Sequence, residues 1–377
     1  MPDPSRSTSS AALRDTFAQV QRHFHQVVVP LWQGPGWNPV LALPYEALLE
    51  GTPLAPQRYR AMACARQLYL FASLLDTPQE ADARAHAAQL FDSLQRHFHD
   101  PLHGGWFYSI DALGQPLDRR KDLYSHAFVI FACAHYRGKV ADPQVDAVLD
   151  QALDLLARHF ADGDGLYHAE LAEDWSDLGS GPLQNPLMHL AEALLVSLDL
   201  RPSPALATTL MRLADGMQRR FVDPERSLVL EHPLGTANNW FEPGHQFEWF
   251  YLVESSPLLR GGALHTSLQR AFEQVERLGV IDGAVQARLA PSGQLLDGTR
   301  RIWAQAEYLR ALTLRPEGEA RVLQQLRALQ QHFLHPAGWT ECREGDGRPA
   351  RHDMPSTTPY HLATCYAGLA AYLPYLQ

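Results

Sequence analysis

The sequence has few cysteines, no long apolar run and no recognisable leader, and each shortage excludes a class of protein. It contains four cysteines, with no CxxC pair and no metal-ligand spacing: Cys64, Cys133, Cys342 and Cys365. We interpret them as small core residues in a reducing cytoplasm. No apolar stretch approaches the ~18 residues of a membrane span, and the first ten residues lack the apolar segment of a signal peptide. We therefore expect a cytoplasmic protein with no membrane partner.

Basic residues are also in short supply. Lysine occurs only at Lys121 and Lys139, and 32 basic residues against 42 acidic ones give a net charge of -10. This balance argues against a nucleic-acid partner, because binding the phosphate backbone needs a basic surface. Hydrophobic residues make up 46% of the 377 residues, enough for a large globular core. The composition therefore predicts an acidic globular protein.

The common catalytic and cofactor signatures are missing as well. The chain has no HExxH, GxSxG, P-loop or dinucleotide-binding motif. The Asp-Gly pairs at 162–165 resemble a calcium loop but lack its further ligands, so we interpret them as a turn. We therefore predict no cofactor and no metal.

A repeat is present in place of these motifs. Short segments ending in His-Phe or Arg-Phe recur at Phe24, Phe98, Phe160, Phe221 and Phe333. The last four follow amphipathic helical patterns and precede turn-rich loops, and a weaker segment near residue 280 occupies the missing position. Repeats of about 60 residues indicate supersecondary units that stack on their neighbours.

A polar residue recurs near the start of the second helix of each unit. These residues are Arg66, His126, His189, His245, Gln305 and His361. The second helices are the more apolar ones, which is typical of inner helices. We therefore predict an all-α fold, an (α/α)6 barrel of six outer–inner helix hairpins with short strand-like fragments in its loops. Residues 15–377 would form one domain after a disordered tail over residues 1–14.

In this barrel the six polar side chains would surround one cavity. Histidines, an arginine, carboxylates and aromatic rings in one cavity predict a site for a small ligand rich in hydroxyl groups. His245 and Glu248 are three residues apart on a helix and project from one face, so we expect His245 to act as base while Glu248 orients it or handles the ring oxygen of the sugar. The helix N-terminus should lower the pKa of His245 and keep it neutral, as a base requires. We expect packing or hydrogen-bonding roles for His126 and Glu192.

Several motifs along the chain resemble the N-acylglucosamine 2-epimerase superfamily over about residues 15–375. The matching segments are CARQLYLFA with Arg66, GQPLDRRKDLYSHAF with Tyr124, NPLMHLAEA with Asn185 and His189, PGHQFEW with His245, Glu248 and Trp249, WAQAE with Trp303, Gln305 and Glu307, and TTPYHL with His361. Met62 departs from the pattern, because relatives often have tryptophan there.

The resemblance implies an (α/α)6-barrel enzyme that acts on sugars without a cofactor or metal. His245 and His361 would be the catalytic histidines, assisted by Glu248, His189 and Arg66. The substrate contacts would be Tyr124, Asn185, Trp303, Glu307, Trp249 and Gln305. Family enzymes remove the C2 proton of an opened aldose and form a cis-enediol. The STTPYHL ending is most similar to mannose isomerases, so the expected reaction interconverts D-mannose and D-fructose.

Other functions remain open at this stage. The same residues would serve a 2-epimerase acting on mannose or glucose, on an N-acylhexosamine, or on cellobiose. An α/α-barrel glycosidase would instead use two carboxylates about 6.5–9.5 Å apart, chosen from Glu170, Asp174, Glu248 and Glu307. A sugar-binding protein without catalysis is the third alternative. The expected partner is a small monosaccharide, and the protein would be a monomer or homodimer.

Overall fold

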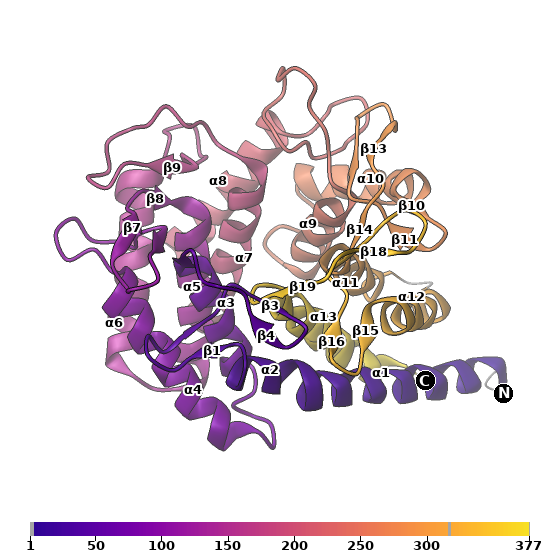
Figure 1. Ribbon diagram of the computed structural model, residues 1–377. Coiled ribbons are helices and arrows are strands. Elements are labelled where there is room, and N and C mark those ends of the chain that lie inside the picture. Colours follow the sequence, from indigo (N-terminus) through magenta and orange to yellow (C-terminus); the bar gives the residue numbers. More distant parts are fainter. Residues whose placement is uncertain (1–3, 316–317, 377) are drawn as a thin grey trace.

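The helices of the protein pack as two concentric rings (Figure 1). The computed structural model describes residues 4–315 and 318–376. Within these residues the inner ring consists of α3 (Ala61–Ala72), α5 (Leu123–Lys139), α7 (Gln184–Leu200), α9 (Pro243–Ser255), α11 (Ile302–Leu312) and α13 (Thr358–Tyr372). Each inner helix packs on the next, and α13 packs on α3 to close the ring. The predicted barrel of six helical hairpins is confirmed.

The outer ring covers the inner one. Among the described residues it contains α1 (Pro4–His23), α4 (Glu80–Ser93), α6 (Pro143–Leu155), α8 (Pro204–Arg220), α10 (Ala263–Gly279) and α12 (Gly318–Phe333). Short helical segments extend the chain at α2 (Val29–Gln33) and η4 (Leu373–Tyr375). α1 packs along α12, so the first outer helix joins the last one (Figure 1).

The inner helices are buried because their sequences are apolar on most sides. Every residue of α3 is buried, and α9 and α13 are buried over most of their length. The outer helices bury one stripe only, as in α10, where the charged residues alternate with a buried face. The buried apolar residues of both rings form one continuous core.

The recurring His-Phe motif lies where three outer helices end. The segments η1 (Phe24–Val28), η2 (Leu94–Phe98) and η3 (Leu156–Phe160) are π-helical turns. Phe24, Phe98 and Phe160 are buried in the core, as are Phe221 and Phe333 in the corresponding outer helices. The motif therefore anchors the end of an outer helix and has no catalytic role in this arrangement.

The expected disordered tail differs from the structure. Helix α1 begins at Pro4, so residues 4–14 are helical, and residues 1–3 lie outside the described residues. Leu13 and Phe17 are buried, and Phe17 packs edge-on against Tyr366 of α13. The N-terminal segment is needed to cover the inner helix α13, a role that its polar composition does not reveal.

Short antiparallel strands fill the loops at the mouth of the barrel and between helices. They pair as β1 (Trp37–Asn38) with β2 (Leu43–Pro44); β4 (Thr52–Pro53), β3 (Ala47–Leu49) and β19 (Asp353–Pro355); β5 (Tyr59–Arg60), β6 (Ser109–Ile110) and β7 (Pro116–Asp118); β8 (Lys121–Asp122) with β9 (Glu170–Leu171); β10 (Val280–Ile281) with β11 (Ala284–Val285); β12 (Arg288–Leu289) with β13 (Leu295–Asp297); β14 (Arg300–Arg301), β17 (Cys342–Arg343) and β18 (Pro349–Arg351); and β15 (Leu334–His335) with β16 (Gly338–Trp339). Pairing of β19 with β3 joins the last loop to the first.

The inner helices start at these loops, and most of them start without a side-chain cap. Only α5 has one, where the Asp122 carboxylate accepts a hydrogen bond from the Ser125 amide. No side chain caps α3, α7, α9, α11 or α13 in the described structure. Uncapped N-termini leave amide donors and partial positive charge at this end of the barrel, where a polar ligand would use them.

No helix in the described part of the chain has the length and apolar character needed to cross a bilayer.

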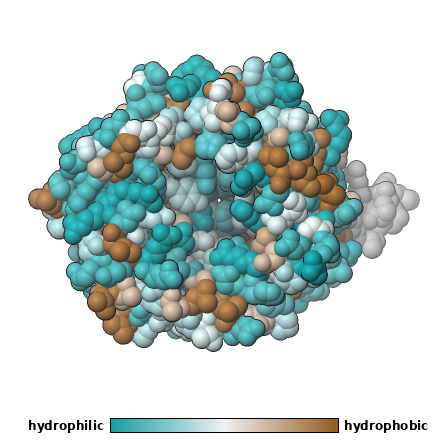
Figure 2. Space-filling view, turned by 45° about the horizontal axis from the view of Figure 1, so that its top comes forward, coloured by the Kyte–Doolittle hydropathy of each residue, from teal (hydrophilic) through white to brown (hydrophobic). Residues whose placement is uncertain are grey.

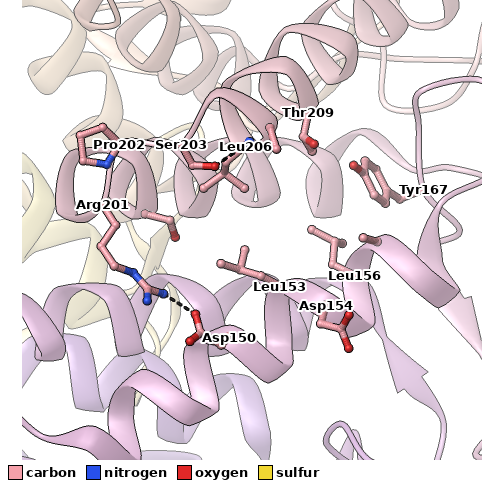
Figure 3. Close-up of a pocket in the computed structure, with 13 residues that line it drawn as sticks. Asp150, Leu153, Asp154, Leu156, Tyr167, Arg201, Pro202, Ser203, Leu206 and Thr209 are labelled. Carbon is pink, nitrogen blue, oxygen red and sulfur yellow. Dashed lines mark hydrogen bonds and ion pairs between the residues drawn. The ribbon is translucent and has the colours of Figure 1, made fainter.

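A surface groove of about 440 Å³ lies on the outer wall, between α6 and the start of α8 (Figure 3). Its edge carries the ion pair of Arg201 with Asp150 and the Ser203 cap of α8. None of its lining residues is a predicted site residue, so this groove is separate from the expected active site.

Candidate active site

The predicted polar residues converge near the N-terminal ends of the inner helices. Figure 2, in which the top of Figure 1 is turned forward, shows a recess near the middle of the exposed face. Ring contacts join side chains from five inner helices: Tyr124 to His189 at 5.1 Å, His245 to Trp303 at 5.0 Å, and Trp303 to His361 at 5.5 Å between centroids. The structure therefore brings together side chains from all parts of the sequence.

His245 forms the first of two histidine–glutamate pairs. Its Nδ1 atom donates a hydrogen bond to Oε1 of Glu231 at 2.8 Å, and both side chains are almost fully buried. Burial lowers the pKa of His245, but Glu231, and more weakly Glu242, outweigh burial and raise it to about 9. His245 is therefore protonated at neutral pH and can donate a proton from Nε2.

The Pro-Gly pair before His245 explains its position. A Cβ atom on Gly244 would lie 2.7 Å from the Trp303 ring and 2.8 Å from Ala304. Glycine therefore lets the start of α9 approach α11 closely enough for the His245 ring to lie beside Trp303. Pro243 occupies the first turn of α9, where its missing amide costs no helical hydrogen bond.

His361 forms the second pair, on the other side of Trp303. Its Nδ1 atom donates to Oε1 of Glu307 at 2.7 Å. The pKa of His361 is well below its usual value because the ring is buried and because Arg66 and Arg310 are close. Burial also raises the pKa of Glu307 to about 7. His361 is therefore neutral, with Nδ1 protonated and the Nε2 lone pair available to accept a proton.

A third group of residues comes from α3, α5 and α7. Arg66 donates from Nη2 to the Tyr124 hydroxyl at 2.7 Å, and its guanidinium lies 4.7 Å from the Tyr360 ring centroid. The Nδ1 atom of His189 lies 3.3 Å from Glu192. Burial lowers the pKa of His189 to about 4. This group supplies one fixed cation and one neutral histidine, which suits the binding of hydroxyl or carbonyl oxygens.

Glu248 does not orient His245 as expected. Its nearest basic neighbour is Nδ1 of His189 at 3.8 Å, and neither of its oxygens has a hydrogen-bond partner in the described structure. Burial and the neighbouring Glu307 and Glu192 raise its pKa well above the usual value. Glu248 is thus a buried acid whose neutral form is favoured. The orienting carboxylate of His245 is Glu231.

The expected lowering of the His245 pKa by the helix N-terminus is also wrong. A full negative charge at hydrogen-bond distance from Nδ1 outweighs the partial charge of the helix end. The helix end acts in the same direction as burial, and together they do not overcome the Glu231 contact.

Two members of the predicted ring hold loops instead of facing the other site residues. His126 accepts a hydrogen bond from the Trp106 amide at 3.2 Å and donates to the Asp122 carbonyl at 2.8 Å. Gln305 uses its amide oxygen and nitrogen on the amide and carbonyl of Val285, both at 2.9 Å. The packing role expected for His126 is confirmed, whereas Gln305, expected to bind substrate, has its amide engaged by the backbone.

The remaining residues that were predicted to line the site differ in whether their side chains are free to contact a substrate. Asn185 is partly buried, and its Oδ1 atom has no protein partner among the described residues. Trp303 lies between the two histidine pairs. Trp249 is fully buried in the core cluster, so its ring packs within the protein. Glu192 accepts hydrogen bonds from His189 and the Tyr360 hydroxyl, which confirms the expected buried network.

Sequence reasoning missed three residues of this site. Glu231 lies in a strand-like loop fragment, SLVLEH, and belongs to no motif. Tyr360 precedes His361 and contacts both Glu192 and Arg66. Arg310 follows Glu307 by one helical turn and lies 3.3 Å from it, a spacing that could have indicated an ion pair.

Within the described residues, three groups of side chains have donor atoms close enough to bind a metal ion. Two belong to the site, His189 with Glu192 and Glu248, and Glu248 with Glu307 and His361. Imidazole and carboxylate donors suit zinc and other transition metals. In the third group, Asp100, His103 and Glu173, the buried Lys121 ammonium already lies 2.6 Å from Asp100.

Comparison with known proteins places this site in a family. Residues 46–365 match the model of the N-acylglucosamine 2-epimerase (GlcNAc 2-epimerase) family. The chain is 29% identical over 371 residues to a mannose-6-phosphate isomerase from Rhizobium meliloti (strain 1021), covering 90% of this chain and 92% of that protein. It is 26% identical over 291 residues to a D-mannose isomerase from Marinomonas mediterranea, covering 70% and 72%.

Solved structures have the same architecture. A cellobiose 2-epimerase from Spirochaeta thermophila DSM 6192 superposes with a TM-score of 0.86 at 21% identity, over 99% of both chains. At that identity the likeness concerns the fold. The family match, which spans most of the chain, decides the enzyme class and favours it over the glycosidase alternative. The chain belongs to the N-acylglucosamine 2-epimerase family, and it is a sugar isomerase or epimerase.

Proposed function

We propose that the protein is an aldose–ketose isomerase that interconverts D-mannose and D-fructose, with His361 as the base and His245 as the acid. The observation that carries this proposal is the pair of histidines on the two sides of Trp303, which differ in protonation. A glutamate holds Nδ1 of each histidine. The Nε2 atom of each ring is therefore directed away from that carboxylate and is the atom that exchanges a proton with the substrate. Relatives named as mannose isomerases support the choice of sugar.

The reaction requires removal of the C2 proton beside the aldehyde of the open-chain aldose. Neutral His361 takes this proton at Nε2, and the electron pair moves to the carbonyl oxygen O1. Protonated His245 and the Arg66 guanidinium stabilise the negative charge that develops on oxygen. His245 gives a proton to O1, His361 returns the transferred proton to C1, and the O2 proton passes to His245, which leaves the ketose carbonyl at C2 and restores both histidines. His361 thus moves one proton between adjacent carbons.

A 2-epimerase is the second candidate, and one observation favours it. In the described structure both histidines have a glutamate at Nδ1 and no protein partner at Nε2. Two such groups on different sides of one substrate are what inversion at C2 requires, since one removes the proton and the other returns it. Relatives named as cellobiose 2-epimerases have this reaction.

Product analysis separates the two reactions. The enzyme is incubated with mannose, mannose 6-phosphate, glucose, cellobiose and N-acetylmannosamine in deuterated water, and products are followed by NMR. We expect fructose from mannose, with deuterium at C1 when the transferred proton exchanges with solvent. Glucose as the main product from mannose would contradict the isomerase proposal and support the epimerase. Preference for the phosphorylated sugar would keep the reaction and change the substrate.

A further inference from the structure

Three buried glutamates meet beneath the site histidines. Glu192 on α7, Glu248 on α9 and Glu307 on α11, here called the acid cluster, are at most 3% exposed. Three carboxylates in one buried space cannot all be ionised without a counter-charge, because each raises the pKa of the others. The pKa of Glu248 is raised in this way by Glu307 and Glu192, in addition to burial.

Arg310 is the cation that contacts the acid cluster. Its Nη1 atom lies 3.3 Å from Oε2 of Glu307 and 3.6 Å from Oε1 of Glu192, so one guanidinium bridges the carboxylates of two inner helices. The guanidinium also lies 4.0 Å from the centroid of the Tyr251 ring. Arg66, the other site arginine, instead donates to Tyr124.

The neighbouring helix is shaped to admit Arg310. A Cβ atom on Gly368 of α13 would lie 3.2 Å from Cγ of Arg310 and 3.5 Å from the Tyr251 hydroxyl. A side chain at this position would press on the arginine stem. Glycine in the middle of a helix is less favourable than alanine, so its presence here agrees with the space that Arg310 needs.

We propose that Arg310 is a positioning residue that fixes the charges of the acid cluster and thereby keeps His361 available as the base. It stabilises the ionised forms of Glu192 and Glu307, and Glu307 in turn holds Nδ1 of His361. It also disfavours a positive charge on His361 itself. Both effects leave the Nε2 lone pair free at neutral pH.

The titratable groups whose charge interacts with this guanidinium come from all six inner helices. They are Tyr69 of α3, His135 of α5, Glu192 of α7, Glu248 and Tyr251 of α9, Glu307 of α11, and Tyr360, His361 and Cys365 of α13. Among these, His361 is the base of the proposed reaction, and its charge state is the quantity that Arg310 would control in catalysis.

The test compares two substitutions that act in opposite directions. Removing the cation in Arg310→Met makes protonation of His361 easier, so the acid limb of the kcat/KM profile should move up by about one pH unit. Removing a carboxylate in Glu192→Gln makes that protonation harder, because Glu192 raises the pKa of His361, so the same limb should move down. Arg315→Met is the matched control, since Arg315 packs on Phe272 away from the cluster.

A merely structural role for Arg310 would lower activity equally at every pH. An unmoved acid limb in a folded Arg310→Met, or shifts of both variants in the same direction, would overturn the proposal. If Arg310→Met does not fold, Arg310→Gln removes the same charge with a polar side chain, and an unmoved acid limb in that variant would overturn the proposal.

The kinetic readout rests on the proposed function, so a second readout avoids turnover. The ring resonances of His361 are titrated by NMR in the unmodified protein and in Arg310→Met, and His361→Gln provides their assignment. We expect protonation of His361 at higher pH without Arg310. Absence of turnover on every sugar, together with this shift, would count against the proposed function alone, whereas an unchanged titration would overturn the role of Arg310.

Discussion

The two halves of the site contain the same pair of residues and hold opposite charges. His245 and His361 each contact a glutamate through Nδ1, at 2.8 and 2.7 Å. Around His245 the further charged neighbours are Glu242, which favours the imidazolium, and Arg301, which disfavours it by less. Around His361 the neighbours include Arg66 and Arg310, which disfavour it. A histidine–glutamate pair therefore does not define an acid or a base. The charged groups just beyond each pair decide whether its histidine acts as an acid or as a base.

The half of the site that contains His361 is the base half, and the half that contains His245 is the acid half. The largest expected effect follows from replacing the histidine of the base half. His361→Gln should lower kcat/KM by about 10²–10⁴-fold, the usual range for loss of a general base, and it should abolish exchange of the C2 proton in deuterated water. His245→Gln should also lose turnover but retain measurable C2 exchange, because His361 remains. Circular dichroism should show native helix content in both.

Equal C2 exchange in the two variants would remove the distinction between the halves. Exchange lost only in His245→Gln would reverse their roles. A useful control is His265→Gln, which changes a histidine paired with Glu254 outside the site and should leave the kinetics unchanged.

A smaller effect is expected from changing the partner of the acid half. Glu231→Gln removes the negative charge that raises the pKa of His245, so the imidazolium should lose its proton at lower pH. The basic limb of the kcat/KM profile is expected near pH 9 in the unmodified protein. We expect it to move down in Glu231→Gln, and turnover at pH 8.5 to fall about tenfold or more.

The same substitution at Glu242, the second carboxylate that raises the pKa of His245, provides the comparison. Glu242→Gln should move the basic limb in the same direction by less, because Glu242 makes a weaker contribution than Glu231. A larger shift in Glu242→Gln than in Glu231→Gln would show that the hydrogen-bonded carboxylate is not the dominant partner.

Sequence patterns predicted the barrel because its determinants are periodic. Apolar inner helices and repeated helix ends recur every 60 residues or so, and no long-range information is needed to recognise them. The meeting of Arg66, His189, His245 and His361 follows from the ring, since all four lie near the starts of inner helices.

The rotation of each side chain around its helix was not predictable in the same way. Gln246, next to His245, holds the Val229 amide and carbonyl, just as Gln305 holds Val285. Gln305 therefore corresponds to Gln246 and not to His245. One residue is a turn of about 100° around a helix, and repeats that vary by a few residues in length do not fix that angle.

Partners from loops were also beyond the sequence pattern. Glu231 precedes His245 by a loop with no repeat, and its contact depends on the path of the backbone between β-like segments. Glu248, by contrast, lies at the expected i+3 spacing and contacts His189 across the barrel instead. Spacing along one helix indicates which residues share a face, and it does not show which neighbouring helix supplies the closer charge.

Stability should depend on pH through the acid half. The pKa of His245 is about 9 in the folded protein against a usual value of 6.5. A raised pKa contributes stability that is fully present below pH 6.5 and is lost as pH rises through 9, on the order of 3 kcal/mol. The difference in melting temperature between the unmodified protein and His245→Gln should therefore shrink from pH 6.5 to 9.5. A constant difference would contradict the raised pKa.

The smallest expected effect is that of a chelator, and it also distinguishes the halves. A divalent ion held by Glu248, Glu307 and His361 would bind only the base half and would occupy the lone pair that proton abstraction needs. The proposed mechanism assigns that lone pair to the substrate, so dialysis against EDTA should leave kcat/KM unchanged. Activity lost on chelation and restored by zinc or manganese would make His361 a ligand. The base would then have to be sought in the other half, where Glu231 holds His245 in its protonated form.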